Sequence, residues 1–236
     1  MRFEDRVVII TGATGGLGQV AAKEFAQRGA RLVLVSRSRE KLADLSASLG
    51  QAQDRVLTHV ARLTEPEAAR RVADAAMQKF GRIDVLLHLV GGWIGGKSVR
   101  ELDPREIETM LQQHLWTSVH LARAVVPHMR LGRWGRILVI SSPTASRPVA
   151  ERAPYAIGKA AQEALVLTLA QELKGSGVTA NLVVVQTIDT ASVRAQQPGA
   201  SNAGGTTPQQ ITATLLHLCA DEAAMINGAR IPLYGG

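Results

Sequence analysis

The sequence predicts an α/β fold, in which a single domain packs helices on both faces of a mainly parallel sheet. Short apolar runs alternate with segments of helical periodicity, a glycine-rich turn follows the first run, and 46% of the 236 residues are hydrophobic. Such alternation is typical of βαβ units, whose parallel strands are covered on both faces. A chain of this length buries a substantial core, so we expect residues 1–236 to form one domain.

The expected strands are six apolar runs, at residues 7–10, 31–35, 55–60, 84–90, 136–141 and 178–185. Helical spacing of apolar residues fills the intervals, for example residues 19–28, 65–80 and 154–174. Another helix begins at Asp103, where an N-cap aspartate, Pro104 and Glu106 form the pattern of a capping box. Residues 191–207, rich in small and polar residues from 196 onward, predict a mobile substrate loop. The alternative is an ordinary surface loop with no role in substrate binding.

The glycine-rich turn, residues 11–18, joins the first strand to the first helix. Gly12 allows a sharp turn, Gly16 lets backbone approach a pyrophosphate, and Gly18 lets helix and strand pack closely. The helix start offers unpaired N–H groups and a positive dipole to phosphates. The turn therefore predicts a nucleotide site, and the alternative is a tight βα turn that binds nothing.

A second motif places Tyr155 and Lys159 four residues apart, with Ser142 thirteen residues upstream of the tyrosine. Residues four apart share one face of a helix, so the ammonium is expected to lower the pKa of the phenol toward working pH. Ser142, at a strand end, is placed to hold a carbonyl that this phenol protonates. Ser141 is the rival for that role, and a buried structural tyrosine is the alternative for Tyr155.

Composition argues against several classes of protein. The net charge is +7, but the basic residues are scattered and aromatics are only 3%, so we expect no nucleic-acid partner. No apolar run reaches the roughly 18 residues that span a bilayer, and the first residues enter a strand at once, so neither membrane nor signal peptide is expected. The histidines lack metal-ligand spacing, and the single Cys219 predicts a core side chain in a reducing cytoplasm.

The glycine turn at 11–18, together with Ser142, Tyr155 and Lys159, resembles the short-chain dehydrogenase/reductase superfamily over nearly the whole chain. The resemblance implies a Rossmann-type sheet of about seven strands, a nicotinamide cofactor, and a homodimer or homotetramer. It implies Tyr155 as the acid or base, Lys159 as the group that lowers its pKa, and Ser142 as a donor to the substrate oxygen. The implied cofactor contacts are Gly12, Thr14, Gly16, Leu17, Gly18, Ser36, Arg37, Arg62, Gly91, Tyr155, Lys159, Ile188 and Thr190. The implied substrate contacts are Trp93, Ser142, Thr144 and Tyr155, although Trp93 is equally compatible with a hydrophobic loop plug.

The end of the second strand indicates the cofactor. No carboxylate lies near Ser36 to bind the adenosine ribose, and Arg37 follows immediately, as suits a 2′-phosphate. We therefore expect NADP(H). The alternative is that Arg37 or Arg39 simply begins a solvated helix, and the glycine turn itself contains no basic residue.

Four positions depart from the family pattern. The family's Asn-Asn-Ala-Gly segment after the fourth strand corresponds to residues 88–91 here, where only Gly91 is retained. Arg62 stands where the family has an aspartate that contacts adenine, and residues 185–186 replace the family's Pro-Gly after the sixth strand. The tetrad asparagine is His114, which we hypothesise holds the water of a proton relay, titrating near neutrality. His114→Asn is then expected to retain activity with an altered pH profile, and the alternative is a helix histidine bonded to a backbone carbonyl. His88 is expected to be a structural strand-end residue.

The favoured function is an NADP(H)-dependent oxidoreductase that transfers hydride between the nicotinamide and a small carbonyl compound or the corresponding secondary alcohol. It is similar to carbonyl and 3-oxoacyl reductases. Arg147 and Arg152 suit an acidic substrate or an acyl carrier, unless they only solvate the surface. The alternative is a catalytically weak NADP(H)-binding sensor or scaffold of the same fold, which the four departures keep open.

Overall fold

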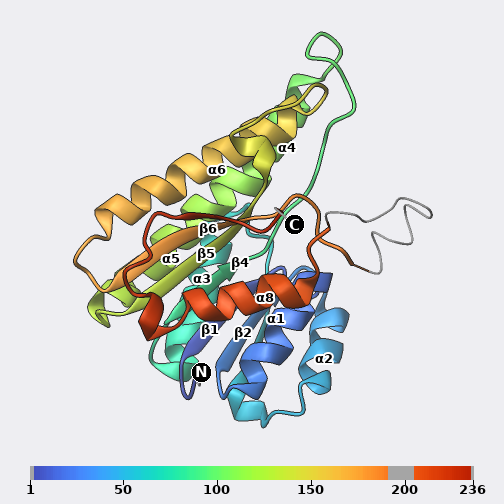
Figure 1. Cartoon of the computed structure of the whole chain (residues 1–236). Coiled ribbons are helices and arrows are strands. Elements are labelled where there is room, and N and C mark those ends of the chain that lie inside the picture. The colour runs from blue at the N-terminus through green and yellow to red at the C-terminus, as the bar shows by residue number, and fades with distance from the viewer. Residues whose placement is uncertain (1–2, 191–204, 235–236) are drawn as a thin grey trace.

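The computed structural model describes residues 3–190 and 205–234 and contains a seven-stranded sheet of order β3-β2-β1-β4-β5-β6-β7 (Figure 1). Every pair of neighbouring strands is parallel. The predicted doubly wound α/β class is confirmed. The strands are β1 (Val7–Thr11), β2 (Arg31–Ser36), β3 (Val56–Val60), β4 (Val85–His88), β5 (Gly135–Ser141), β6 (Val178–Val184) and β7 (Arg230–Pro232).

Helices cover both faces of the sheet, as Figure 1 shows. One layer contains α1 (Gly16–Gln27), α2 (Arg39–Ser48) and α8 (Pro208–Leu218). The other contains α3 (Pro66–Phe80), α5 (Thr117–Leu131) and α6 (Ala153–Glu172), and α4 (Pro104–Leu111) packs beside α6. Because side chains alternate along a strand, Val8 and Ile10 of β1 enter the first core while Val7 and Ile9 enter the second.

The predicted elements are confirmed with small shifts at their ends. The strand predicted at 84–90 ends at His88, and the capping box at the start of α4 is formed by Asp103 and Glu106. Residues 191–204 of the predicted substrate loop lie outside the described residues. The end of that segment is ordered, because Thr206 bridges to Ile188 and Thr207 caps α8. Cys219 is buried in the first core, as predicted, and burial raises its pKa.

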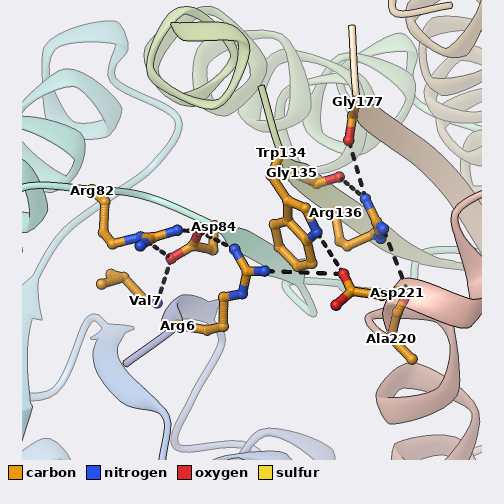
Figure 2. A network of polar contacts seen from close by, with 10 residues as sticks. All are labelled: Arg6, Val7, Arg82, Asp84, Trp134, Gly135, Arg136, Gly177, Ala220 and Asp221. Atoms are coloured by element: carbon orange, nitrogen blue, oxygen red, sulfur yellow. Dashed lines mark hydrogen bonds and ion pairs between the residues drawn. The ribbon is translucent and has the colours of Figure 1, made fainter. Parts of the chain in front are cut away.

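Charged side chains join the amino ends of the strands, opposite the glycine turn (Figure 2). The buried carboxylate of Asp84 accepts from Arg6 at 3.2 Å, from Arg82 at 2.6 Å and from the backbone N–H of Val7 at 2.8 Å. The Trp134 ring lies between two guanidinium groups, 3.7 Å from Arg6 and 4.3 Å from Arg136. This cluster ties together the strands that carry the site at the other edge. Among the helices of the described residues, none is both long and apolar enough to cross a membrane.

Candidate active site

The glycine turn forms a backbone cradle at the carboxyl edge of the sheet. Gly12 has a left-handed φ of 70°, which favours glycine, and turns the chain from β1 toward α1. A Cβ on Gly18 would meet the Gly12 carbonyl oxygen and lie 2.7 Å from the Cα of Ala13, so only glycine allows the helix to pack this closely. A Cβ on Gly16 would lie 2.6 Å from Cγ2 of Thr190. Gly16 thus brings α1 against the segment after β6, in addition to its predicted role toward a phosphate.

A cavity of about 440 Å³ lies against this cradle. Of the predicted cofactor contacts, it is lined by Gly12, Thr14, Ser36, Arg37, Arg62 and Gly91. Thr14 and Ser36 are joined by a hydrogen bond of 2.7 Å between their hydroxyls. Arg37 and Arg62 follow two adjacent strands and are both exposed, so two guanidinium groups border one end of the cavity. The cavity thus joins a glycine cradle to positively charged side chains, as suits the phosphates of a nucleotide cofactor.

Other predicted cofactor contacts lie outside the lining of this cavity. Leu17 is buried in the core, so only its backbone N–H at the start of α1 remains for a cofactor. Ile188 packs against the first core, and the backbone N–H of Thr190 donates to its carbonyl at 3.0 Å. The lining also includes residues that were not predicted as contacts, among them Gln113 and Thr117. These two lie close to His114 in the sequence, but no local motif distinguishes them.

Ser142 and Tyr155 meet where β5 ends and α6 begins. The buried Ser142 hydroxyl bonds to the hydroxyl and N–H of Thr144, each at 3.3 Å, which places Thr144 behind the serine. Burial raises the pKa of Tyr155, while a hydrogen bond from Ser142 and the charge of Arg152 lower it in part. Ser141 instead donates to Glu163 at 2.7 Å. Geometry therefore selects Ser142 over Ser141 as the partner of the tyrosine.

Lys159 is buried, and it does not have the predicted effect on the pKa of Tyr155. Its Nζ donates to the Ile140 carbonyl and to Oε1 of Gln162, both at 2.9 Å. Burial lowers the pKa of Lys159 to about 7, and Glu163 opposes that shift. The expectation that Lys159 lowers the pKa of Tyr155 is wrong for this structure, because burial of the phenol dominates and raises its pKa. The phenol is therefore protonated at neutral pH.

His114 lies on the π-helical turn Gln112–Trp116 between α4 and α5, with its ring 5.6 Å from that of Tyr155. Its Nε2 bonds to the Gly92 carbonyl at 3.1 Å, and since a carbonyl only accepts, the proton is on Nε2. Nδ1 is buried without a partner among the described residues. Burial, and next the charge of Lys159, lower the pKa of His114 to about 3. The predicted titration near neutrality is wrong, so His114→Asn should not alter the pH profile between pH 5 and 9.

His88 is the structural strand-end residue that was predicted. The Thr117 hydroxyl donates to the Gln113 carbonyl at 2.6 Å, so it must accept from Nε2 of His88 at 3.2 Å. Nδ1 of His88 then accepts from the Thr11 hydroxyl at 2.8 Å. This neutral imidazole ties β1 and β4 to α5. Burial lowers its pKa to about 3, with Lys159 adding to the shift.

Acid is expected to destabilise the protein through His88. The unfolded chain binds a proton below about pH 6.5 and the folded chain only near 3, so the free energy of unfolding falls as the pH drops below 6.5. The expected slope is about 1.4 kcal/mol per pH unit for this histidine. Urea unfolding at pH 7.5 and 5.0 measures it. Between pH 7.5 and 5.0, the loss of unfolding free energy should be smaller in His88→Gln than in the wild type. It should be unchanged in His217→Gln, a control at an exposed residue. Equal losses in the wild type and both variants would contradict the assignment to His88.

Trp93 lies on the loop after β4, and 57% of its surface is exposed. The loop rests on the segment before α6, because the N–H of Gly96 donates to the Glu151 carbonyl at 2.7 Å. The indole is therefore exposed on this loop and does not fill a core as a plug. Among the described residues, no group of three or more histidine, cysteine or acidic side chains is arranged to hold a metal.

Comparison with known proteins places this site in a family. Residues 6–200 match the family model described as short chain dehydrogenase. The chain belongs to the short-chain dehydrogenase/reductase family. It is 31% identical to a 1,6-dihydroxycyclohexa-2,4-diene-1-carboxylate dehydrogenase from Pseudomonas putida, over all of this chain and 93% of the relative. It is 29% identical to the 3-oxoacyl-(acyl-carrier-protein) reductase FabG of Salmonella typhimurium, over all of this chain and 98% of that protein.

A solved structure of this family aligns along the whole chain. L-sorbose reductase from Gluconobacter frateurii, solved with NADPH and L-sorbose, is 25% identical, with a TM-score of 0.90 over 100% of this chain and 97% of that one. As a short-chain dehydrogenase/reductase, the protein is an oxidoreductase that acts on hydroxyl or carbonyl groups of small molecules and uses a nicotinamide cofactor.

Proposed function

We propose that this short-chain dehydrogenase/reductase is an NADPH-dependent carbonyl reductase in which Tyr155 protonates the substrate oxygen. The observation that carries the proposal is the hydrogen bond between the Ser142 hydroxyl and the Tyr155 phenol, with the buried Lys159 one helical turn further along α6, in a fold whose glycine cradle borders a cavity. The bound nicotinamide would supply the hydride. The raised pKa of Tyr155 supports the direction of reduction, since a protonated phenol is the form that donates a proton.

Each side chain has a distinct task in this proposal. The Ser142 hydroxyl donates a hydrogen bond to the substrate oxygen and stabilises the charge that develops on it. Tyr155 transfers its proton to that oxygen. The Lys159 ammonium, held on one side by protein acceptors, would bind the cofactor ribose on the other. Trp93 covers the apolar part of the substrate.

The two arginines at the cavity end support NADPH over NADH. Arg37 and Arg62 carry fixed positive charge, and no carboxylate of residues 3–190 or 205–234 lines the cavity to bind ribose hydroxyls. Arg37→Ser is expected to weaken NADPH binding about 10- to 100-fold and to leave NADH binding nearly unchanged. Fluorescence titration measures both dissociation constants. Arg39→Ser, on the first turn of α2, is the control, and equal weakening of both nucleotides by Arg37→Ser would argue against a 2′-phosphate site.

The function itself is tested by nucleotide titration followed by a panel of ketones. The panel pairs neutral ketones with carboxylated and thioester ones, because Arg152 acts electrostatically on Tyr155 and would favour an anionic substrate nearby. NADPH binding with oxidation by one of these compounds is the expected result. Tight binding without turnover across the panel would favour a sensor or scaffold, and failure to bind either nucleotide would overturn the proposal.

A further inference from the structure

Behind Lys159, helix α6 buries a second polar side chain. Gln162 is 0% exposed, one helical turn after the lysine. Its Oε1 accepts from Lys159 Nζ at 2.9 Å, and its Nε2 donates to the His114 carbonyl at 3.1 Å and to the Ser118 hydroxyl at 2.9 Å. The carboxamide therefore connects the lysine directly to the π-helical turn and to α5.

The orientation of this amide follows from its neighbours. The Ser118 hydroxyl donates its single hydrogen to the His114 carbonyl at 2.6 Å, so it must accept from Gln162. The ammonium of Lys159 only donates, so it must face an oxygen. Both constraints give the same orientation, in which both N–H groups of the Gln162 amide donate hydrogen bonds and its oxygen accepts one. A buried group satisfied this completely is rigid.

Charged and titratable groups surround Lys159 from several elements. Tyr155 and Glu163 lie on its own helix, His88 faces it from β4, and His114 faces it from the π-helical turn. Both histidines are neutral near pH 7. Glu163 is committed to Arg230 at 2.8 Å and to Ser141 at 2.7 Å. The direct protein acceptors for the ammonium are therefore neutral oxygens, those of Ile140 and Gln162.

We propose that Gln162 is a positioning residue, which holds Lys159 in its charged form and aims it at the cofactor side of the site. The amide uses one N–H of the ammonium and the Ile140 carbonyl another, which leaves the third for a bound ribose. An apolar residue at 162 would leave a buried ammonium with one protein acceptor, which favours the neutral amine. The consequence for turnover rests on the proposed reductase function; the effect on the lysine does not.

The effect on the lysine is measured without cofactor or substrate. The chain has six lysines, so ¹³C-lysine NMR resolves the titration of Lys159, assigned with Lys159→Met. Gln162→Met is expected to lower the titration midpoint by about one to two pH units, and Gln162→Glu to raise it by a similar amount. Gln171→Met, an exposed glutamine on the same helix, is the matched control and should leave the midpoint unchanged. Circular dichroism verifies that each variant is folded.

Activity supplies the second measurement. The alkaline limb of the kcat/KM profile should move in the same direction as the Lys159 midpoint, downward for Gln162→Met and upward for Gln162→Glu. A purely structural glutamine would lower activity in both variants with the limb unmoved, which would overturn the inference. A midpoint that shifts in protein without turnover would support the role of Gln162 and count against the reductase. If the variants remain active and the Lys159 midpoint does not shift, the result would support the reductase and overturn the role of Gln162.

Discussion

Tyr155→Phe is expected to lower kcat for carbonyl reduction by about 10²- to 10⁴-fold, the range of general acid catalysis by a positioned side chain. The substitution removes the hydroxyl alone and keeps the ring that packs edge-on against His114, with centroids 5.6 Å apart. The fold should therefore remain intact. The loss would follow from the missing proton, because Ser142 can donate a hydrogen bond to the oxygen but has no comparable acidity.

The chain offers a matched control for this experiment. Tyr234 is its other tyrosine, and Tyr234→Phe should leave kcat unchanged. The two variants and the wild type are compared by initial rates of NADPH oxidation with the best ketone of the panel, and by thermal unfolding. Turnover by Tyr155→Phe within threefold of the wild type would show that another group protonates the substrate.

Asp84→Ala is expected to lower the free energy of unfolding by about 3 kcal/mol, at the lower end for a broken buried ion pair. The side chain of Asp84 is 3% exposed and joins Arg6, Arg82 and the N–H of Val7, as Figure 2 shows. Its removal leaves a buried backbone donor without a partner at the start of β1. The two arginines remain partly exposed, at 26% and 49%, so water can solvate them and the loss stays near this lower end.

Thermal unfolding measures this effect, with an expected decrease in Tm of about 6–12 °C for a chain of this size. Asp84→Asn keeps an acceptor for Val7 and should lose less. Asp74→Ala, an exposed aspartate on α3, should change Tm little. If Asp84→Ala and Asp74→Ala unfolded at the same temperature, the cluster would contribute nothing to stability.

Much of the fold was predictable, because the signals are local. The apolar runs identified β1 to β6, the spacing of apolar residues identified helices such as α1, α3 and α6, and the capping box at Asp103 located the start of α4. The last strand, β7, matches none of the predicted runs and was implied only by the family resemblance. The π-helical turn Gln112–Trp116 was not predicted. Its five residues carry no distinctive pattern, and it is decided by the packing of α4, α5 and α6 against one another.

The site divides in the same way. The sequence by itself determined the glycine cradle and the shared face of Tyr155 and Lys159, because glycine requirements and helical spacing are properties of neighbouring residues. Only the tertiary structure decided the protonation states and the partners. Burial raised the pKa of Tyr155, lowered that of His114 to about 3, and placed Gln162 against Lys159. Desolvation and hydrogen bonding depend on residues brought from distant parts of the chain, which no local spacing records.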